Sequence, residues 1–268
     1  MKQILIAAHR GLRGGNLVEN TLPAFRAALR SGADILEMDL KRTQDGVLVL
    51  FHDLDVHRLL PTLHGPVRAH TLRELRCFSL NNQIGEPSGC AVATLEEALS
   101  AFRNRCLINL DQADGFIEEA WPLVTRQDMA DQVVFKGAPP FDGALARLAR
   151  CDWQPLFMPI LRTDADIAAF RALPGQVRIP MAEVMFQRED AAVLAPAFRQ
   201  ELARRDIRVW VNALDLGKYP PDMCALHNDT VSMLHGPESG WGWLIDHGAD
   251  VIQTDFPREL RDYLGAKN

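Results

Sequence analysis

The feature of this sequence that most constrains its fold is the alternation of short apolar runs with helical patterns along the whole chain. Eight apolar runs have strand length, and their near-continuous apolar character is typical of parallel strands that helices cover on the outside. The repetition predicts an α/β fold, a closed (β/α)8 TIM barrel, and leaves an open doubly wound sheet as the alternative. The predicted strands are residues 4–8, 35–40, 107–111, 133–136, 156–161, 177–184, 209–214 and 251–254.

Helical patterns fill the intervals between these runs. Phe25, Ala28 and Leu29 recur at the spacing of one helix face. Thr94 stands directly before a run that opens with two glutamates, which is the pattern of an N-cap with acidic residues in the first turn. The predicted helices are residues 22–30, 95–103, 116–124, 144–151, 165–173 and 190–205.

Length and charge narrow the class of protein. A chain of 268 residues is close to the usual size of one such barrel, roughly 250 residues, so we expect residues 1–268 to form a single domain. A formal net charge of −6 and a pI near 5.8 argue against a nucleic-acid partner, because nucleic-acid binders usually carry a basic face. The five cysteines form no CxxC pair, and we expect reduced thiols.

Targeting signals are not evident in the sequence. No run approaches the roughly 20 apolar residues of a membrane helix. The first apolar run is too short for the hydrophobic part of a signal peptide. We therefore expect a cytoplasmic protein without stable membrane association.

Two segments interrupt the alternation. Residues 53–93 are rich in His, Gly, Pro and Asn and are too long for a simple loop, so they predict a small insertion over the barrel mouth. Residues 215–248 contain Pro220-Pro221 and Trp241-Gly242-Trp243, and they predict a lid followed by the last helix, which ends near Gly248. The two tryptophans either line a pocket or pack the helix, and we favour packing.

Unusual polar residues gather where the predicted strands end. In a barrel of this kind, the C-terminal strand ends and the loops that follow them form the active site, so this pattern is the main indication of an enzyme. The residues are His9 and Arg10 after the first strand, Glu37 and Asp39 on the second, Asp111 on the third, Lys136 on the fourth, Glu183 on the sixth, and Trp210 and Asn212 on the seventh.

Glu37 and Asp39 predict a metal site. Residues i and i+2 of a strand point to the same face, and two carboxylates on one face repel each other unless a cation lies between them. Asp111 would complete a site of three carboxylates. Oxygen ligands without nearby cysteine favour one divalent cation, Mg²⁺ or Ca²⁺. The alternative is that Glu37 and Asp39 face the outer helices and pair there with Lys or Arg.

A turn at Asp45-Gly46 would bring a histidine to the same rim. Asp-Gly is a strong turn signal. If the chain folds back there, two residues whose numbers add up to about 90 lie opposite each other. His52 then returns beside Glu37 and Asp39, and His9 reaches the rim from the first strand.

Two histidines and a divalent cation suit phosphodiester cleavage. One imidazole removes a proton from the attacking oxygen and the other protonates the leaving alkoxide. Arg10 offers a forked cation to the phosphate. Lys136 either adds a point charge or is an exposed terminal residue.

Several stretches of the chain resemble the glycerophosphodiester phosphodiesterase family. The resemblance extends from about residue 6 to about residue 258 and is most specific near the N-terminus, where several motifs occur in order. Those motifs are Ala8-His9-Arg10-Gly11, Glu19-Asn20-Thr21, Glu37-Met38-Asp39, Thr43-Gln44-Asp45-Gly46 and His52-Asp53, and the later landmarks are residues 95–98, 209–212 and 248–257.

The resemblance implies a TIM barrel that hydrolyses glycerophosphodiesters to an alcohol and sn-glycerol 3-phosphate. It implies that the glycerol 2-hydroxyl attacks phosphorus and that water then opens a cyclic phosphate. In this reading Glu19 orients Arg10, whereas Asn20 and Thr21 cap the first helix. The implied acid–base pair is His9 and His52, the implied metal ligands are Glu37, Asp39 and Asp111, and the candidate substrate-binding residues are Arg10, Glu19, Lys136, Glu183, Trp210 and Asn212.

The sequence departs from the family pattern on the third strand. The family usually has Glu there with Lys two residues later, whereas this chain has Asp111 and Ala113. A related group, the sphingomyelinase D-like lipases, resembles this barrel and also uses Asp at that position. Lys136 from the next strand is the candidate replacement for the missing lysine.

Three functions therefore remain open from the sequence. The first is a phosphodiesterase with a small-molecule glycerophosphodiester substrate. The second is a phospholipase D-like enzyme that acts on lysolipids at membranes, and the third is a noncatalytic barrel that binds a phosphorylated metabolite.

Overall fold

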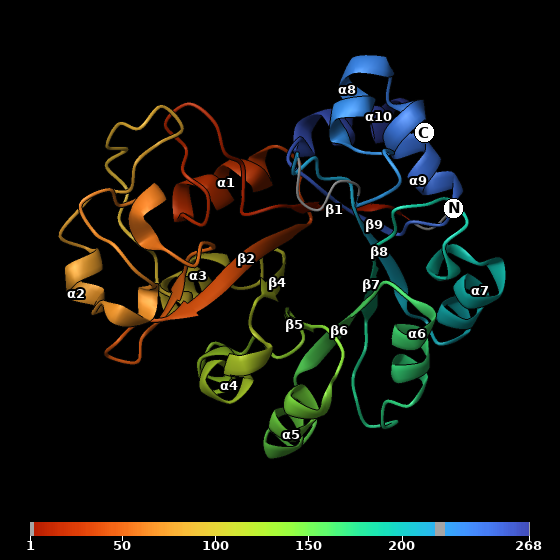
Figure 1. Ribbon diagram of the computed structural model, residues 1–268, viewed down its shortest axis with the longest axis horizontal. Coiled ribbons are helices and arrows are strands. Elements are labelled where there is room, and N and C mark those ends of the chain that lie inside the picture. Colours follow the sequence, from red (N-terminus) through yellow and green to blue (C-terminus); the bar gives the residue numbers. More distant parts are fainter. Residues whose placement is uncertain (1–2, 218–222, 268) are drawn as a thin grey trace.

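The computed structural model describes residues 3–217 and 223–267. Eight parallel strands form a closed barrel, and helices surround it (Figure 1). The predicted TIM barrel is therefore confirmed. The barrel strands are β1 (Leu5–Ala8), β2 (Ile35–Arg42), β4 (Leu107–Asp111), β5 (Val133–Gly137), β6 (Leu156–Leu161), β7 (Met181–Val184), β8 (Arg208–Asn212) and β9 (Val251–Thr254).

Strand β1 closes the barrel. It pairs in parallel with β2, where Ala7 lies opposite Ile35, and with β9, where Leu5 lies opposite Val251. Because both sides of β1 are paired, the barrel strands have no free edge. This closure excludes the open doubly wound sheet.

The predicted turn at Gly46 forms a hairpin at the rim. Strand β3 (Leu48–Leu50) runs antiparallel to β2, with Leu40 opposite Leu50 and Arg42 opposite Leu48. The residue numbers of each pair add up to 90, as the sequence predicted. Gly46 has φ 82°, a conformation that glycine adopts without steric cost.

The outer helices follow the predicted positions closely. Thr94 forms the expected N-cap as part of a capping box with Glu97. The segment 190–205 differs, because a short 3₁₀ turn comes first and the helix begins at Pro196, a residue suited to a first helical position. The helices are α1 (Leu22–Arg30), α3 (Leu95–Phe102), α4 (Ile117–Arg126), α5 (Asp142–Arg150), α6 (Asp164–Arg171), α7 (Pro196–Arg204), α8 (Asp229–His235), α9 (Trp243–Asp246) and α10 (Pro257–Lys267).

The barrel interior is layered. Its lower layer is an apolar cluster that includes Ala7, Ile35, Trp210 and Val251. Side chains two positions further along the same strands face the same interior. These next positions are polar and form a layer above the apolar one: Glu37, Asn109, Lys136, Glu183, Asn212 and Gln253, all buried.

The segment 53–93 packs as an insertion beside the β2–β3 hairpin and occupies the orange and yellow lobe of Figure 1. It contains the 3₁₀ turns Val56–Arg58 and Val67–Ala69 and helix α2 (Leu72–Leu75). A separate hydrophobic cluster joins it to the hairpin. Members of this cluster include Val49, Phe51, Val56, Leu60, Val67, Leu75 and Val92.

The predicted lid lies partly outside the described residues, since Pro220 and Pro221 fall in the gap. The prediction that the last helix ends near Gly248 is wrong, because α10 follows β9. Trp241 and Trp243 follow the gap, and both pack against neighbouring side chains, which is the role that the sequence favoured. Trp241 is buried and donates a hydrogen bond from Nε1 to Asp229. Trp243 is stacked against His227 and His247.

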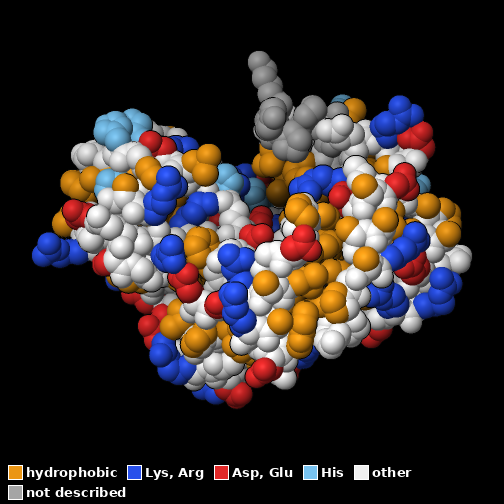
Figure 2. All heavy atoms as spheres, turned by 60° about the horizontal axis from the view of Figure 1, so that its bottom comes forward, with side chains coloured by type: hydrophobic (Ala, Val, Ile, Leu, Met, Phe, Trp, Pro, Cys, Tyr) orange, Lys and Arg blue, Asp and Glu red, His pale blue; other side chains and the backbone are white. Residues whose placement is uncertain are grey.

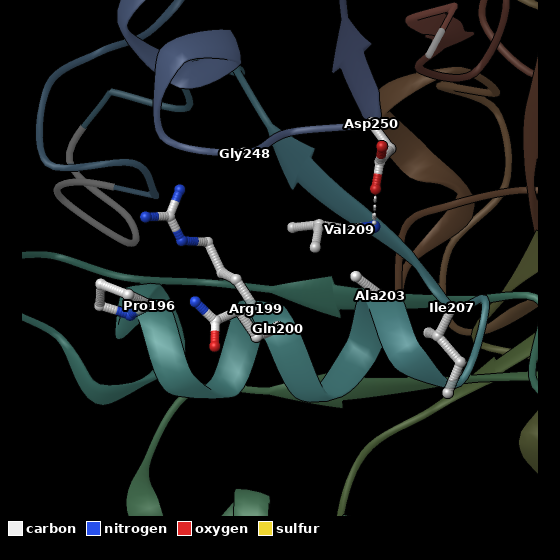
Figure 3. A pocket seen from close by; sticks show the side chains of 8 residues that line it. All are labelled: Pro196, Arg199, Gln200, Ala203, Ile207, Val209, Gly248 and Asp250. Atoms are coloured by element: carbon white, nitrogen blue, oxygen red, sulfur yellow. Dashed lines mark hydrogen bonds between the residues drawn. The ribbon is translucent and has the colours of Figure 1, made fainter. Parts of the chain in front are cut away.

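A cavity of about 350 Å³ lies at the opposite end of the barrel, where β8 and β9 begin (Figure 3). Helix α7 forms one wall through Arg199 and its neighbours, and Val209 donates its backbone N–H to Asp250 in the other wall, at 2.9 Å. Residues at this end of a TIM barrel usually contribute to stability. Within the described ranges, no helix combines the length and apolar character needed to span a membrane.

Gly11 should be intolerant of a side chain. Its φ is 79°, and an added Cβ would lie 2.9 Å from the backbone of Ala24. Gly15 also has a positive φ, 54°, but open space around it. We expect Gly11→Ala to lower the free energy of unfolding by about 1–3 kcal/mol more than Gly15→Ala, because only Gly11→Ala adds overpacking to the backbone strain. Urea unfolding of both variants measures the difference, and equal losses would contradict the account.

Candidate active site

Three carboxylates meet inside the barrel mouth. Strand pairing sets Asp39 of β2 beside Asp111 of β4, and Glu37 lies two residues earlier on the same face of β2. Oxygen atoms of all three lie within 4.8 Å of one another. The alternative in which Glu37 and Asp39 face the outer helices is wrong, since Ile35 on the same face belongs to the inner cluster.

The acidic cluster has the donor set of a hard divalent cation. Glu37 and Asp39 are each 1% exposed, and carboxylate oxygens are the ligands that Mg²⁺ and Ca²⁺ prefer. Burial, and after it the charge of Asp39, raise the pKa of Glu37 well above its usual value. A cation bound here would relieve this repulsion, so the three residues fit the metal that the sequence predicts.

Two amide side chains hold Asp39 in place. Asn20 donates to its Oδ2 at 2.9 Å and accepts its backbone N–H at 3.1 Å, while Gln112 donates to its Oδ1 at 2.9 Å. The expected helix-capping role of Asn20 is therefore wrong. Thr21 alone is the N-cap of α1, because Asn20 has turned inward with φ 56° to reach the carboxylate.

Arg10 lies among the carboxylates. Its backbone N–H donates to Glu37 at 2.9 Å, and its guanidinium donates to Glu19 at 3.1 Å. Its Nε lies 3.2 Å from Asp39 Oδ2. Glu19 thus holds Arg10, as expected from the sequence, whereas contact of Arg10 or Glu19 with substrate phosphate stays a prediction.

His9 is oriented by a carboxylate. The His9 side chain is buried, and its Nδ1 lies 2.9 Å from Oδ1 of Asp255, which also pairs with Arg13. Burial lowers the pKa of His9, against the opposing effect of Asp255. A neutral imidazole that donates Nδ1–H to Asp255 presents Nε2 as its proton-accepting nitrogen.

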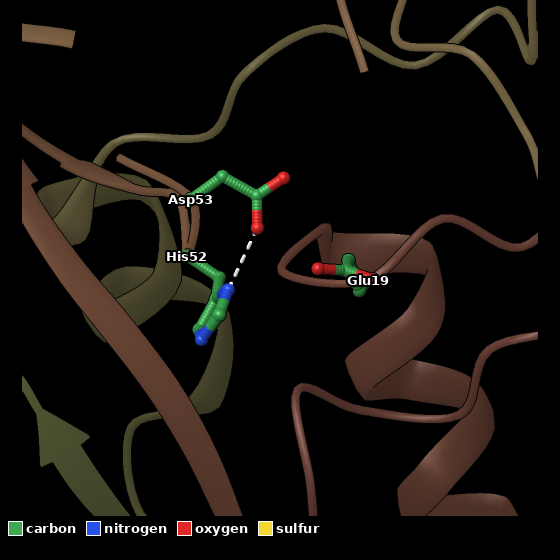
Figure 4. Close-up of side chains that lie close together, drawn as sticks. All are labelled: Glu19, His52 and Asp53. Atoms are coloured by element: carbon green, nitrogen blue, oxygen red, sulfur yellow. Dashed lines mark hydrogen bonds and ion pairs between the residues drawn. The ribbon is translucent and has the colours of Figure 1, made fainter. Parts of the chain in front are cut away.

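His52 has the same type of partner. Its Nδ1 lies 2.7 Å from Oδ1 of Asp53, and one side-chain ligand atom from each of His52, Asp53 and Glu19 lies within 4.8 Å of the others (Figure 4). About a third of the His52 side chain, 35%, is exposed. Arg58 pairs with both Asp53 and Glu19, so an arginine offsets part of the negative charge around His52.

The two histidines are therefore supported alike. Each imidazole donates from Nδ1 to an aspartate that pairs with an arginine, and Glu19 lies within 4.0 Å of Arg13 as well as Arg58. Sequence reasoning missed Asp255 as a site residue. Its signal was its place directly after the last strand, the same rim position that singled out His9 and Asp111.

Lys136 is buried on the next strand, so the alternative of an exposed terminal residue is wrong. Its Nζ lies 2.8 Å from Asp111 and 3.0 Å from Glu183, and Asn212 donates to Glu183 at 3.0 Å. Burial would lower the pKa of Lys136, but the two carboxylates outweigh it and raise the pKa. Burial raises the pKa of Asp111, but Lys136 and the backbone N–H of Gln112 together outweigh burial and lower this pKa.

Trp210 lies below this polar layer. Its side chain is fully buried in the inner apolar cluster and donates from Nε1 to Asn212 at 2.8 Å. The strand position of Trp210 faces the lower layer of the barrel, and its contact with substrate stays a prediction. Glu183 and Asn212 lie one layer higher, and their contact with substrate stays a prediction.

The model of the glycerophosphoryl diester phosphodiesterase family matches residues 9–163, more than half of the chain. The chain belongs to this family. Residues 157–264 of the chain also match the model of a domain of unknown function. A glycerophosphodiester phosphodiesterase from Bacillus altitudinis is 38% identical over 109 residues, which cover 40% of this chain and 44% of that relative. The matched stretch thus spans less than half of the relative's length.

Solved structures with the same fold can be superposed on nearly the whole of this chain. One is a glycerophosphoryl diester phosphodiesterase from Parabacteroides distasonis, with a TM-score of 0.77, 24% identity, and coverage of 99% of this chain and 87% of that one. Another is an Oleispira antarctica phosphodiesterase in complex with the product sn-glycerol-3-phosphate, with a TM-score of 0.66, 17% identity, and coverage of 97% and 96%. Figure 2 shows a hollow in the surface of this molecule beside the insertion, with acidic and histidine side chains in the hollow.

The acidic cluster should bind a divalent cation that stabilises the fold. At a free concentration 100 times Kd, Mg²⁺ or Ca²⁺ should raise the free energy of unfolding by about 2.7 kcal/mol. Glu37→Gln removes one ligand charge at constant size and should abolish most of this increment. Urea unfolding with and without the cation measures it.

A matched control is Glu96→Gln, which alters an exposed glutamate that pairs with Arg126 on the outer helices. This variant should keep the full cation-dependent increment. An undiminished increment in Glu37→Gln would show that the cation binds elsewhere.

Proposed function

We propose that this protein is a metal-dependent phosphoric diester hydrolase that cleaves glycerophosphodiesters to an alcohol and sn-glycerol 3-phosphate. The observation that carries the proposal is the meeting of two carboxylate-oriented histidines with three carboxylates at one rim of the barrel. Family membership supports the reaction class. The product named for the Oleispira antarctica structure supports the glycerol phosphate moiety of the substrate.

Glu37, Asp39 and Asp111 would hold the cation. The cation, Mg²⁺ or Ca²⁺, would neutralise nonbridging phosphate oxygens and lower the pKa of the attacking hydroxyl. Arg10 lies beside these residues and would bind a phosphate oxygen with its guanidinium fork. Lys136 would hold Asp111 in place from below, and Glu183 and Asn212 would in turn hold Lys136.

The two histidines would divide the proton transfers. His9 is buried and its pKa is lowered, which suits acceptance of a proton from the attacking glycerol hydroxyl at Nε2. His52 is more exposed, which suits donation of a proton to the departing alcohol and exchange of that proton with solvent. Asp255 and Asp53 would keep the two rings in the required tautomer and orientation.

Removal of either imidazole should lower turnover. We expect His9→Ala and His52→Ala to reduce kcat for glycerophosphoglycerol by at least roughly 100-fold, the scale of general acid–base catalysis. Excess chelator should abolish wild-type activity, and Mg²⁺ or Ca²⁺ should restore it. Release of sn-glycerol 3-phosphate in a coupled assay measures all of these rates.

The matched control is His235→Ala, because His235 is an exposed histidine at the end of α8. It should keep wild-type turnover. Full activity in chelator would remove the cation from the proposal, and full activity of either alanine variant would remove that histidine.

Asp255 should act as a positioning residue for His9. Asp255→Asn removes the charge that raises the pKa of His9, so the acid limb of the pH–rate profile should shift to lower pH. Because an amide can present either its oxygen or its N–H to Nδ1, the tautomer of the ring is no longer fixed, and kcat should fall by roughly tenfold or more. Asp262→Asn, an exposed change on α10, should alter neither, and an unshifted acid limb in Asp255→Asn would contradict the role.

A further inference from the structure

A second cavity opens beside the acidic cluster. It has a volume of about 460 Å³, within the range of small-molecule sites. Its walls come from the β2–β3 hairpin, the insertion and the segment after β4. The lining residues are Lys41, Arg42, Asp53, Leu54, Pro66, Val67, Arg68, Gln112, Asp114 and Phe116.

This cavity adjoins the candidate active site, because two of its lining residues contact residues of that site. Asp53 lines it and lies 2.7 Å from Nδ1 of His52, and Gln112 lines it and donates to Asp39 at 2.9 Å. The cavity therefore lies on the side of His52. Under the proposed function, His52 protonates the departing alcohol, so the cavity is placed to receive that alcohol.

Cations dominate the charge of the cavity. Three basic residues, Lys41, Arg42 and Arg68, line it against two acidic ones, Asp53 and Asp114. The charge of Asp53 is already matched by Arg58, and that of Arg42 by Glu119 at 2.6 Å.

When these two pairs are set aside, Lys41, Arg68 and Asp114 remain among the lining residues, and together they carry one net positive charge. Lys41 is held at the cavity wall by its Nζ–Gln112 hydrogen bond, and Asp114 is exposed. Arg68 is exposed and has no ion pair or side-chain hydrogen bond with any residue in the described part of the chain. Its guanidinium is therefore available to a ligand.

The aromatic content of the cavity is unsuited to a quaternary ammonium. Such groups are bound by cages of several aromatic faces. Phe116 is the one aromatic residue among the described lining residues, and the guanidinium carbon of Arg42 already lies 5.8 Å from its ring centroid. A trimethylammonium group would meet cations here instead of aromatic faces.

We propose that this cavity binds the alcohol part of the substrate and favours an anionic headgroup, one that carries a phosphate or carboxylate, over a quaternary ammonium. The inference rests on the proposed function for its position beside the departing alcohol. Arg68 would supply the headgroup contact through two parallel N–H donors, and Lys41 would add a second positive charge.

Turnover of three substrates tests this selectivity. They are glycerophosphoglycerol with a terminal phosphate, neutral glycerophosphoglycerol, and glycerophosphocholine. We expect kcat/KM to be highest for the phosphate-bearing substrate and lowest for glycerophosphocholine, with the extremes at least roughly tenfold apart. Arg68→Gln should lower kcat/KM for the phosphate-bearing substrate by roughly tenfold and leave the neutral one unchanged.

A matched control is Arg73→Gln, which removes an exposed arginine of α2 outside the cavity. This variant should keep the wild-type order of substrates. Equal kcat/KM for glycerophosphocholine and the phosphate-bearing substrate, or an order that Arg68→Gln does not change, would overturn the inference.

Binding without turnover separates this inference from the proposed function. Calorimetric titration in chelator with phosphoserine and with choline should show tighter binding of phosphoserine, weakened by Arg68→Gln and not by Arg73→Gln. Absence of turnover with this binding pattern retained would refute the proposed function alone. Phosphoserine binding that Arg68→Gln leaves unchanged would refute the anionic headgroup site even in an active hydrolase.

Discussion

The arrangement of the barrel mouth depends on two carboxylates that the fold buries together. Glu37 and Asp39 share one face of β2 and are almost fully buried, where like charges are strongly unfavourable without cationic partners. Arg10 lies against both of them, and Lys136 pairs with the third carboxylate, Asp111. The same concentration of negative charge that requires these cations also makes the position suitable for a divalent metal.

The layered barrel interior keeps these charges apart from the apolar core. Ala7, Ile35 and Trp210 fill the lower layer, while the polar side chains lie above it toward the C-terminal strand ends. The period of two along each strand produces this division without any change of backbone geometry. Catalytic groups can therefore change at the mouth while the lower layer maintains the closed barrel.

The Lys136 contact bears on the departure from the family pattern on the third strand. Ala113, two residues after Asp111 and beyond the end of β4, is buried in the outer core. The cation near Asp111 therefore comes from β5 instead of from that position. Its Nζ also pairs with Glu183, so the charge is fixed by two carboxylates. A lysine held in this way is well placed to set the position of Asp111, whose side chain is one methylene shorter than the family's usual glutamate.

The sequence by itself determined the eight strands, the β2–β3 hairpin register and the shared face of Glu37 and Asp39, since all of these follow from strand periodicity and one turn signal. Closure of the barrel, and with it the meeting of these two residues with Asp111 inside the mouth, came from the pairing of the strands. Only the tertiary structure decided which side chains hold these site residues in place. Asp255 reaches His9 across 246 positions, and Asn20 turns from the expected helix cap to hold Asp39. Such contacts depend on which strands become neighbours when the barrel closes and on which side chains fit between them, and no local pattern of residues encodes that geometry.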